Sequence, residues 1–469
     1  MKVLFIYPER GYSSSGNRTI WQGRFYYSMS VFMAFLKKHG FEVAFHQSGN
    51  PIRTLELSRI LQRESPDLLA FSSLNHLSLE VKRLARKVKV LAPGLTVAWG
   101  GFFPTTDPES ALNSPGVDCV CVGEGELPFL NLLSSLRDKA EITATPGFWF
   151  NSRTGAVKNR TGGLVENLDS LPFADLDASG YAGSDDYLIF KRFPLMAARG
   201  CRHSCDFCCN SALNRLYGSK TFRFRSPLHV CAELEQVTSR YPDLESIQFQ
   251  NDIFFPDLEW LSRFVEQYKK IGLPVSFLLS TGSIDQESVK LLKKLPVKEV
   301  FVGVESGTLE MKERIGKQSV LTDTVKRCRM LSDAGLRVAT FNMLGIPGEC
   351  GADVMKSVFL NAEINPALLQ LSYLYPYRGT PVYEKWWKIL STRRFYTYFE
   401  GSIFQRHFLN RHLRFYYHHF IDLVEMAAKS KNIRFLNLLF SDFLPLPLKR
   451  ILLQLLKKSG QKSIFQVRF

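Results

Sequence analysis

The sequence Cys201-Arg-His-Ser-Cys205-Asp-Phe-Cys208 places three cysteines at the spacing C-x3-C-x2-C. Three thiolates on one short loop can bind three irons of a cubic [4Fe-4S] cluster, because soft sulfur ligands suit iron–sulfur chemistry. The fourth iron then has no protein ligand, so a substrate or cofactor can bind there. Four-cysteine electron-transfer clusters and closed zinc sites lack such an open position. We therefore predict that Cys201, Cys205 and Cys208 are the metal ligands.

This spacing, with the aromatic Phe207 directly before the third cysteine, resembles the signature of the radical-SAM enzymes. In that family the open iron chelates S-adenosylmethionine and passes it an electron, which releases a 5'-deoxyadenosyl radical. A zinc knuckle or a chance group of thiols is the alternative, although ordinary zinc sites favour a C-x2-C pair with a second pair downstream. We interpret the neighbouring Cys209 as a packing residue.

Composition indicates a folded globular protein of two or three domains, since the chain has 469 residues, of which 45% are apolar. Nine cysteines without regular spacing, and a first apolar run too short for a signal peptide, predict a reducing cytoplasm. The net charge is +16, of which +11 lies after Tyr383. Such an excess predicts a surface for anionic partners such as phospholipid headgroups or an acidic substrate, and RNA is less favoured. The alternative is a solvated basic face without a partner.

Residues 1–150 alternate short apolar runs with amphipathic stretches that end at glycine or proline. We expect helices over 26–39 and 78–91 and strands over 3–7, 41–45, 68–71, 95–99 and 117–122. The central strands are almost entirely apolar, as strands buried on both faces should be. This alternation predicts an α/β fold with a doubly wound parallel sheet.

Ligands of such sheets bind beyond the carboxyl ends of the strands. Glycine at a strand end lets a large planar ligand approach the backbone closely. The loops concerned resemble those of the cobalamin-binding domain that precedes the radical-SAM domain in one large subgroup. The resemblance implies cobalamin contacts at Tyr7, Pro8, Ser72, Ser73, Leu74, Gly100, Gly101, Phe102, Gly123, Glu124 and Glu126. Residues 9–16 lack the Asp-x-His-x-x-Gly stretch, so the cobalt should have no histidine below it; a domain that has lost cobalamin is the alternative.

The middle of the chain predicts a hairpin and an acidic linker over 151–190, then a second run of strand–loop–helix units over 191–383. We expect strands over 246–250, 275–279, 300–304, 338–344 and 368–374, and one face of a helix from Leu261, Phe264, Val265 and Tyr268. Six such units predict a partial (β/α)6 barrel whose carboxyl-terminal rim carries the site.

Several rim segments resemble the S-adenosylmethionine motifs of the radical-SAM family. Glu305-Ser306 is similar to its Gly-x-Glu-Ser segment, and Gly345-Ile-Pro347-Gly-Glu349 to its Gly-x-Pro-Gly-Glu segment. The resemblance implies cofactor contacts at Phe207, Gln250, Asn251, Ser280, Glu305, Ser306, Gly345 and Pro347. One departure is Ser280-Thr-Gly-Ser283, which stands where many relatives carry arginine and leaves the anchor of the cofactor carboxylate open.

Residues 384–469 are aromatic, basic and helix-like. Asp442, Pro445 and Pro447 interrupt the longest apolar run, which is well short of the roughly 20 residues needed to span a bilayer. The basic amphipathic stretch 446–458 is compatible with a helix lying at a membrane interface or packing on its own domain. We expect peripheral contact with the inner face of the membrane as one possibility.

Taken with both cofactors, the resemblance implies cobalamin-dependent methylation of an unactivated carbon in a hydrophobic or natural-product substrate, through a 5'-deoxyadenosyl radical and methylcobalamin. The alternative chemistry is oxidation, cyclisation or rearrangement of a tetrapyrrole or other natural product. The alternative of another class of protein is a non-catalytic iron–sulfur module with an RNA-binding or regulatory role. We do not expect nucleic acid to be the partner. The enzyme would need a low-potential electron donor such as flavodoxin or ferredoxin.

Overall fold

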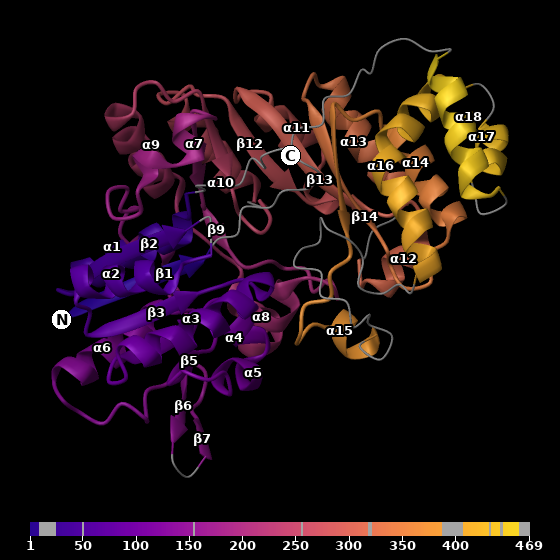
Figure 1. Cartoon of the computed structure of the whole chain (residues 1–469). Coiled ribbons are helices and arrows are strands. Elements are labelled where there is room, and N and C mark those ends of the chain that lie inside the picture. The colour runs from indigo at the N-terminus through magenta and orange to yellow at the C-terminus, as the bar shows by residue number, and fades with distance from the viewer. Residues whose placement is uncertain are drawn as a thin grey trace. The chain divides into compact units, whose positions relative to one another are not determined.

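The computed structural model describes residues 1–8, 25–48, 51–152, 155–254, 257–317, 321–386, 407–430, 433–440 and 444–458 (Figure 1). The chain forms two compact units. The first comprises residues 1–203, 208–245 and 377–380, and the second comprises residues 204–207, 246–376 and 381–469. The loop 9–16, which lacks the cobalt-ligating histidine motif, lies outside the described residues.

The first unit is built on a seven-stranded sheet with the order β2-β1-β3-β4-β5-β6-β7. Its strands are β1 (Lys2–Pro8), β2 (Glu42–Ser48), β3 (Leu68–Ser72), β4 (Thr96–Gly100), β5 (Cys119–Cys121), β6 (Phe148–Ser152) and β7 (Gly155–Lys158). The first five strands are parallel, which confirms the predicted parallel sheet. The predicted hairpin is also present, but β6 pairs antiparallel with β5, so the hairpin extends this sheet and is not a separate element.

Helices cover both faces of this sheet, and their apolar side chains explain the near-continuous apolar strands. Leu4 and Ile6 of β1 pack in one core with residues of α2 and α3, whereas Phe5 meets Phe32 of α1 on the opposite face, with ring centroids 5.4 Å apart. Alternate residues of one strand therefore enter different cores. The helices are α1 (Tyr27–Lys38), α2 (Thr54–Glu64), α3 (Ser78–Leu91), α4 (Phe102–Thr106), α5 (Pro108–Leu112) and α6 (Glu126–Arg137), with the 3-10 turn η1 (Asn75–Leu77).

The rest of the first unit consists of short elements around an aromatic core and one long helix. Tyr181 packs edge-on against Phe193 and Tyr241, with centroids 5.4 and 5.1 Å apart. Ser226 caps the long helix α9 by accepting a hydrogen bond from the His229 N–H. The elements are η2 (Leu168–Ser170), η3 (Tyr181–Gly183), α7 (Asp185–Leu188), β8 (Arg192–Leu195), β9 (Ala198–Arg199), α8 (Cys209–Tyr217), η4 (Gly218–Thr221), β10 (Arg223–Phe224) and α9 (Pro227–Arg240).

The second unit holds five parallel strands in the order β15-β14-β13-β12-β11. They are β11 (Ser246–Phe249), β12 (Val275–Leu279), β13 (Val297–Glu305), β14 (Val338–Leu344) and β15 (Leu368–Tyr373). Apart from β9 and β10, which form a two-stranded sheet, the strands after residue 190 are β8 and these five, and the predicted α/β partial barrel is confirmed. The helices are α10 (Leu258–Tyr268), α11 (Gln286–Leu292), α12 (Leu309–Arg314), α13 (Leu321–Asp333), α14 (Gly351–Ile364) and α15 (Pro381–Trp386), with the 3-10 turn η5 (Thr281–Ser283). The four predicted apolar residues of α10 are all buried.

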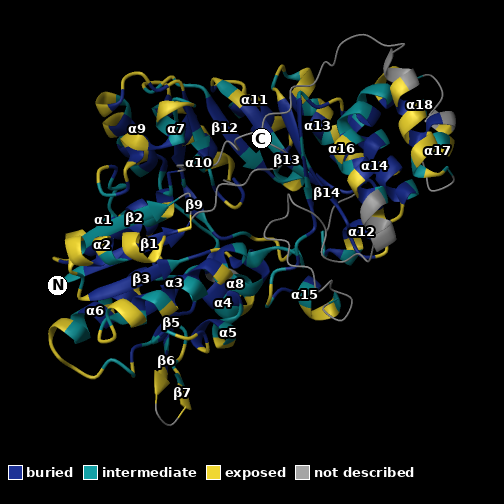
Figure 2. Cartoon of the chain, viewed as in Figure 1, coloured by how far each residue is buried: buried dark blue, intermediate teal, exposed yellow. Residues whose placement is uncertain are grey.

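The C-terminal segment is helical, as predicted, and comprises α16 (His407–Lys429), α17 (Ile433–Phe440) and α18 (Leu446–Lys458). Leu413, Phe420 and Val424 of α16 lie in one core with Val358 of α14 and Leu371 of β15. The helices thus cover an outer face of the sheet, and the buried residues appear dark blue in Figure 2. None of the described helices combines the length and hydropathy needed to cross a bilayer.

Candidate functional site

The cysteine loop joins β9 to α8, and its thiols differ from most others in the chain. Cys201, Cys205 and Cys208 are partly exposed, whereas Cys119, Cys121, Cys231 and Cys328 are buried. Burial raises the pKa of the Cys231 and Cys328 thiols to about 12, which disfavours the thiolate form that binds metal. Accessible thiols that could ligate an iron are therefore found in this loop.

Hydrogen-bond donors support two of the three sulfurs. The His203 N–H donates to Cys201 Sγ at 3.4 Å, and Asn210 Nδ2 donates to Cys208 Sγ at 3.7 Å. Such N–H donors stabilise thiolates in iron–sulfur sites. Among the described residues no three metal-ligating side chains already converge on one point. Three accessible thiols on one loop, two of them with N–H donors, are ligands of the kind that a [4Fe-4S] cluster requires.

The predicted S-adenosylmethionine residues lie on the loops that follow consecutive parallel strands of the second unit. Gln250 and Asn251 follow β11, Ser280 follows β12, Glu305 ends β13 and is followed by Ser306, and Gly345 and Pro347 follow β14. Asn251 and Ser306 are buried. Since neighbouring parallel strands end at the same edge of a sheet, the structure brings these residues to one rim.

Phe207 has a packing role at this rim that the motif alone did not indicate. Its ring contacts an apolar cluster that includes Met311, Ile346 and Leu374. The N–H of the preceding Asp206 donates to the Ile315 carbonyl at 2.9 Å. Through these contacts, residues 204–207 of the cysteine loop pack against the turn after α12.

Two charged groups at the rim stand out by their surroundings. Glu305 Oε1 lies 3.2 Å from Lys317 Nζ, and no motif pointed to Lys317. Glu349 accepts a hydrogen bond from the Gly345 N–H at 2.6 Å, and burial raises the pKa of this carboxyl to about 8. Glu349 therefore holds a proton at neutral pH and stabilises the turn that carries Gly345.

The predicted cobalamin loops follow β1, β3, β4 and β5, which are neighbours in the sheet of the first unit. Tyr7 and Pro8 end β1, Ser72 ends β3, and Gly100 ends β4; the other predicted residues follow them directly. The Ser73 N–H donates to the Gly100 carbonyl, and the Trp99 indole donates to Ser73 Oγ at 2.9 Å. Gly101 has a positive φ of 95°, and a Cβ there would lie 2.7 Å from the Ser73 carbonyl oxygen. The close packing of these two loops thus requires glycine at this position.

The loop after β5 makes contacts that the sequence interpretation did not include. A Cβ at Gly123 would lie 1.9 Å from Tyr217 Oη, and this hydroxyl accepts a hydrogen bond from the Glu124 N–H at 2.9 Å. Glu124 forms an ion pair with Arg223, and Glu126 Oε1 lies 2.6 Å from Arg199 Nη2. These contacts tie β9, α8 and β10 to the β5 loop within the first unit. The cobalamin contacts proposed for Gly123, Glu124 and Glu126 stay predictions.

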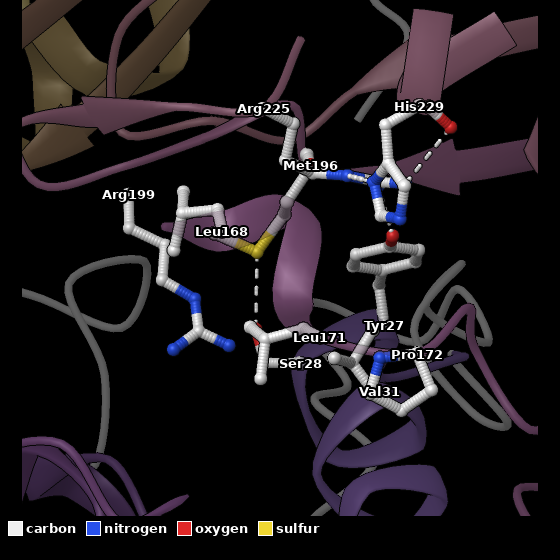
Figure 3. Close-up of a pocket in the computed structure, with 10 residues that line it drawn as sticks. All are labelled: Tyr27, Ser28, Val31, Leu168, Leu171, Pro172, Met196, Arg199, Arg225 and His229. Carbon is white, nitrogen blue, oxygen red and sulfur yellow. Dashed lines mark hydrogen bonds between the residues drawn. The ribbon is translucent and has the colours of Figure 1, made fainter. Parts of the chain in front are cut away.

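A small cavity of about 20 Å³ lies within the first unit beside a buried ion-pair network (Figure 3). Arg225 Nη1 donates to Tyr27 Oη and to Glu233 Oε2, each at 2.6 Å, and Arg225 Nε donates to His229 Nδ1. A cavity of this size holds about one water molecule, so it is too small for an organic substrate. It is lined by Tyr27, Ser28, Val31, Leu168, Leu171, Pro172, Met196, Arg199, Arg225 and His229.

Comparison with known proteins matches the regions that carry the two predicted cofactor sites. The model of the B12 binding domain matches residues 27–133, and that of the radical SAM superfamily matches residues 196–360. The chain is 25% identical over 363 residues to the hopanoid C-3 methylase of Methylococcus capsulatus, covering 74% of this chain and 67% of the methylase. It is 22% identical over 408 residues to the anaerobic magnesium-protoporphyrin IX monomethyl ester cyclase of Rubrivivax gelatinosus, covering 82% of this chain and 70% of the cyclase.

Among solved structures, the radical S-adenosylmethionine methyltransferase TsrM of Kitasatospora setae shares the fold, with a TM-score of 0.65 and 16% identity over 84% of this chain and 77% of TsrM. The chain belongs to the radical-SAM superfamily, in the group whose members carry a B12-binding domain before the radical-SAM domain. It is an enzyme, and the cofactors of these two domains are a [4Fe-4S] cluster with S-adenosylmethionine and cobalamin. This membership argues against the non-catalytic alternative.

Proposed function

We propose that this enzyme transfers a methyl group to an unactivated carbon of a hydrophobic or natural-product substrate. The observation that carries the proposal is the accessible three-thiol loop in one chain with a domain of the cobalamin-binding class. When bound, the cluster with S-adenosylmethionine supplies radical initiation and cobalamin supplies the methyl group. Transfer to carbon therefore requires both domains.

In this proposal each part of the chain has a separate binding role. Cys201, Cys205 and Cys208 hold the cluster, and the rim after β11, β12, β13 and β14 binds S-adenosylmethionine. The loops after β1, β3, β4 and β5 bind cobalamin, and Gly101 allows two of these loops to pack closely together. An electron reaches the cluster from a low-potential donor such as flavodoxin or ferredoxin.

An apolar patch on the second unit's sheet supports the proposal that the substrate is hydrophobic. Leu278 of β12 pairs with Phe301 of β13, whose ring stacks on that of Phe341 of β14, with centroids 5.3 Å apart. These side chains are partly exposed, and Gln370 of β15 pairs with Phe341 beside them. Adjacent residues such as Leu371 instead enter the core beneath α14 and α16, so the patch faces away from those helices. Apolar side chains with an amide at the edge suit a largely apolar molecule with one polar group.

A second candidate is radical cyclisation, oxidation or rearrangement of a tetrapyrrole or other natural product with the same cofactors. The similarity to the magnesium-protoporphyrin ester cyclase extends over 82% of this chain and favours it. Mass spectrometry of the product separates the two, because methyl transfer adds one methylene to the substrate.

The C-terminal helices support a further part of the proposal, peripheral contact with the inner face of the membrane from the cytoplasm. Leu448 and Ile451 of α18 are about half exposed, whereas Leu453 packs into the core. Two exposed apolar residues on a basic helix suit shallow insertion at a lipid interface. Sedimentation with anionic vesicles tests this contact.

The function is tested by purifying the enzyme without oxygen, reconstituting the cluster, adding hydroxocobalamin and recording visible and EPR spectra with and without S-adenosylmethionine. We expect a corrin spectrum that survives gel filtration and a cluster signal that S-adenosylmethionine perturbs. Cys205→Ala should lose the cluster, whereas Cys209→Ala, the matched control on the adjacent thiol, should keep it. A cluster without bound corrin would rule out methyl transfer through cobalt.

A further inference from the structure

Four basic side chains lie close together on the first unit, where α3, α4 and α8 adjoin (Figure 1). Arg215 of α8 donates to the carbonyl of Gly379, and the neighbouring Arg378 donates to Asp107 Oδ2 at 3.0 Å. Asp107 directly follows α4. Arg86 and Arg215 are exposed, and the side chain of Arg378 is 54% exposed. We define the basic patch as Lys82, Arg86, Arg215 and Arg378.

Lys82 and Arg86 of α3 complete this basic patch and lie one helical turn apart. Lys82 Nζ lies over the Phe103 ring of α4, 5.4 Å from its centroid. Burial lowers the pKa of Lys82; the Arg378 charge lowers it further, the Asp107 carboxylate opposes this, and the Arg86 charge adds to the lowering. Arg378 and Arg86 are therefore both within electrostatic reach of Lys82, with one carboxylate among them.

The carboxylates next to the basic patch bind other cations. Glu80 of α3 pairs with Arg83, and Glu109 Oε1 of α5 lies 2.5 Å from Lys158 Nζ. Within the described contacts, Asp107 is the carboxylate that pairs with a member of the patch. Four positive charges thus face one negative charge, and such an excess attracts an acidic surface and speeds its encounter with the protein.

Helix α8 connects the basic patch to the cysteine loop. Cys208 is the N-cap residue of α8, and Arg215 lies about 10 Å further along the helix axis. Asn214, the residue before Arg215, donates to the carbonyls of Cys201 and His203 at 3.0 and 3.2 Å. The patch therefore adjoins the segment that carries two of the three predicted cluster ligands.

We propose that the basic patch is the docking surface for the acidic electron-transfer protein that reduces the cluster, an inference that rests on the function proposed above. An acidic, low-potential flavodoxin has the complementary charge. Its reduced flavin anion loses one electron and becomes the neutral semiquinone, while the oxidised cluster gains this electron, and no proton is transferred. An electron donor has to approach the cluster, whereas a lipid surface or RNA has no need of a position beside the cysteine loop.

The experiment measures the rate at which reduced flavodoxin reduces the cluster of the oxygen-free enzyme, by stopped-flow absorbance. We expect Lys82→Glu with Arg86→Glu to lower the second-order rate constant at least about tenfold at low salt, because such charges act chiefly on association. Added salt should slow the wild-type reaction and narrow the difference. Lys38→Glu with Arg59→Glu, on exposed residues of α1 and α2, makes the same change in net charge and should leave the rate within about twofold.

Dithionite, a small reductant that needs no docking surface, should reduce the cluster of every variant at the wild-type rate. Equal slowing with flavodoxin and with dithionite would indicate a structural role for the basic patch and overturn the proposal. An unchanged rate with flavodoxin would also overturn it. Arg86→Glu alone replaces the double variant if that variant fails to keep its cluster, and it should still slow the flavodoxin reaction selectively.

Isothermal titration of the same variants with flavodoxin, tRNA and anionic vesicles gives a readout that is independent of electron transfer. We expect the double variant to weaken flavodoxin binding in parallel with the rate. Loss of tRNA or vesicle binding with flavodoxin binding retained would assign the patch to that ligand and overturn the proposal. A wild-type cluster that S-adenosylmethionine does not perturb would overturn the proposed function as well, so the two failures are distinguishable.

Discussion

Glu349 should make the stability of the second unit depend on pH in an unusual direction. Its side chain is 4% exposed, and while Oε2 accepts the bond from Gly345, Oε1 has no hydrogen-bond partner within the described part of the chain. Burial, with the charge of Asp353 adding to it, raises the pKa of this carboxyl from 4.5 to about 8. The carboxyl therefore keeps its proton in the folded state at pH values where the unfolded chain has lost it.

The sign and size of the effect follow from proton linkage. Between pH 4.5 and about 8 the unfolded state binds fewer protons at Glu349, so the free energy of unfolding falls as the pH rises. The slope is about 1.4 kcal/mol per pH unit, which amounts to a few kcal/mol across the window. Below the lower pKa and above the upper one the contribution is constant. Glu349→Gln keeps the shape, stays neutral and should remove this slope.

Hydrogen exchange read by mass spectrometry gives the measurement, because peptides within residues 344–364 report local opening of the Gly345 turn and α14. We expect the protection free energy of these peptides, corrected for intrinsic exchange, to fall from pH 5 to 8 in wild type and to stay level in Glu349→Gln. Glu363→Gln, an exposed carboxylate on the same helix, is the control and should follow wild type. Parallel profiles for wild type and Glu349→Gln would refute the reasoning.

Two further substitutions test the packing that positions the sites. Arg225→Met leaves the Glu233 carboxylate buried without its cation, and it should lower the free energy of unfolding in urea by about 3–5 kcal/mol. Adding Glu233→Gln should recover part of this loss. A loss below about 1 kcal/mol in the single variant would contradict the expectation. Gly307→Ala places a Cβ 2.4 Å from the Ser357 backbone nitrogen, which α14 holds fixed, and should cost about 1–3 kcal/mol, whereas Gly183→Ala, with nothing within 4 Å, should be nearly neutral. Equal melting temperatures for the two alanine variants would count against the second expectation.

Strands could be predicted from the sequence most directly where they are buried over most of their length. The run 68–71 is wholly buried in β3, and Val338–Leu344 coincides with β14. A strand with both faces covered has a continuous apolar sequence. Gly345 directly follows β14 and marks its end. Helix α2 was missed, although Leu57, Ile60 and Leu61 show the i, i+3, i+4 spacing of its buried face.

The ion pairs at both sites could not be predicted, because their partners are distant in sequence and carry no motif. Arg223 and Glu124 are 99 residues apart, and the sequence interpretation assigned Glu124 to a cofactor. Lys317 lies in a turn after α12, and only the fold brings it beside Glu305. Local sequence patterns specify the strand ends and the types of residue at a rim. Which residue forms an ion pair with a rim carboxylate depends on the tertiary packing.

The charge of the C-terminal segment shows why composition alone overstates a basic surface. Lys449 is completely buried, and its Nζ donates to Tyr416 Oη at 3.0 Å, with the ammonium also over the Tyr416 ring. A buried ammonium needs such a partner because removing it from water is costly. Lys449 therefore helps to hold α18 against α16, and its charge adds little to the electrostatic potential at the protein surface. The lipid contact proposed for α18 rests on Leu448 and Ile451 together with the remaining cations, so charge reversal at exposed positions should affect vesicle binding more than a neutral change at Lys449.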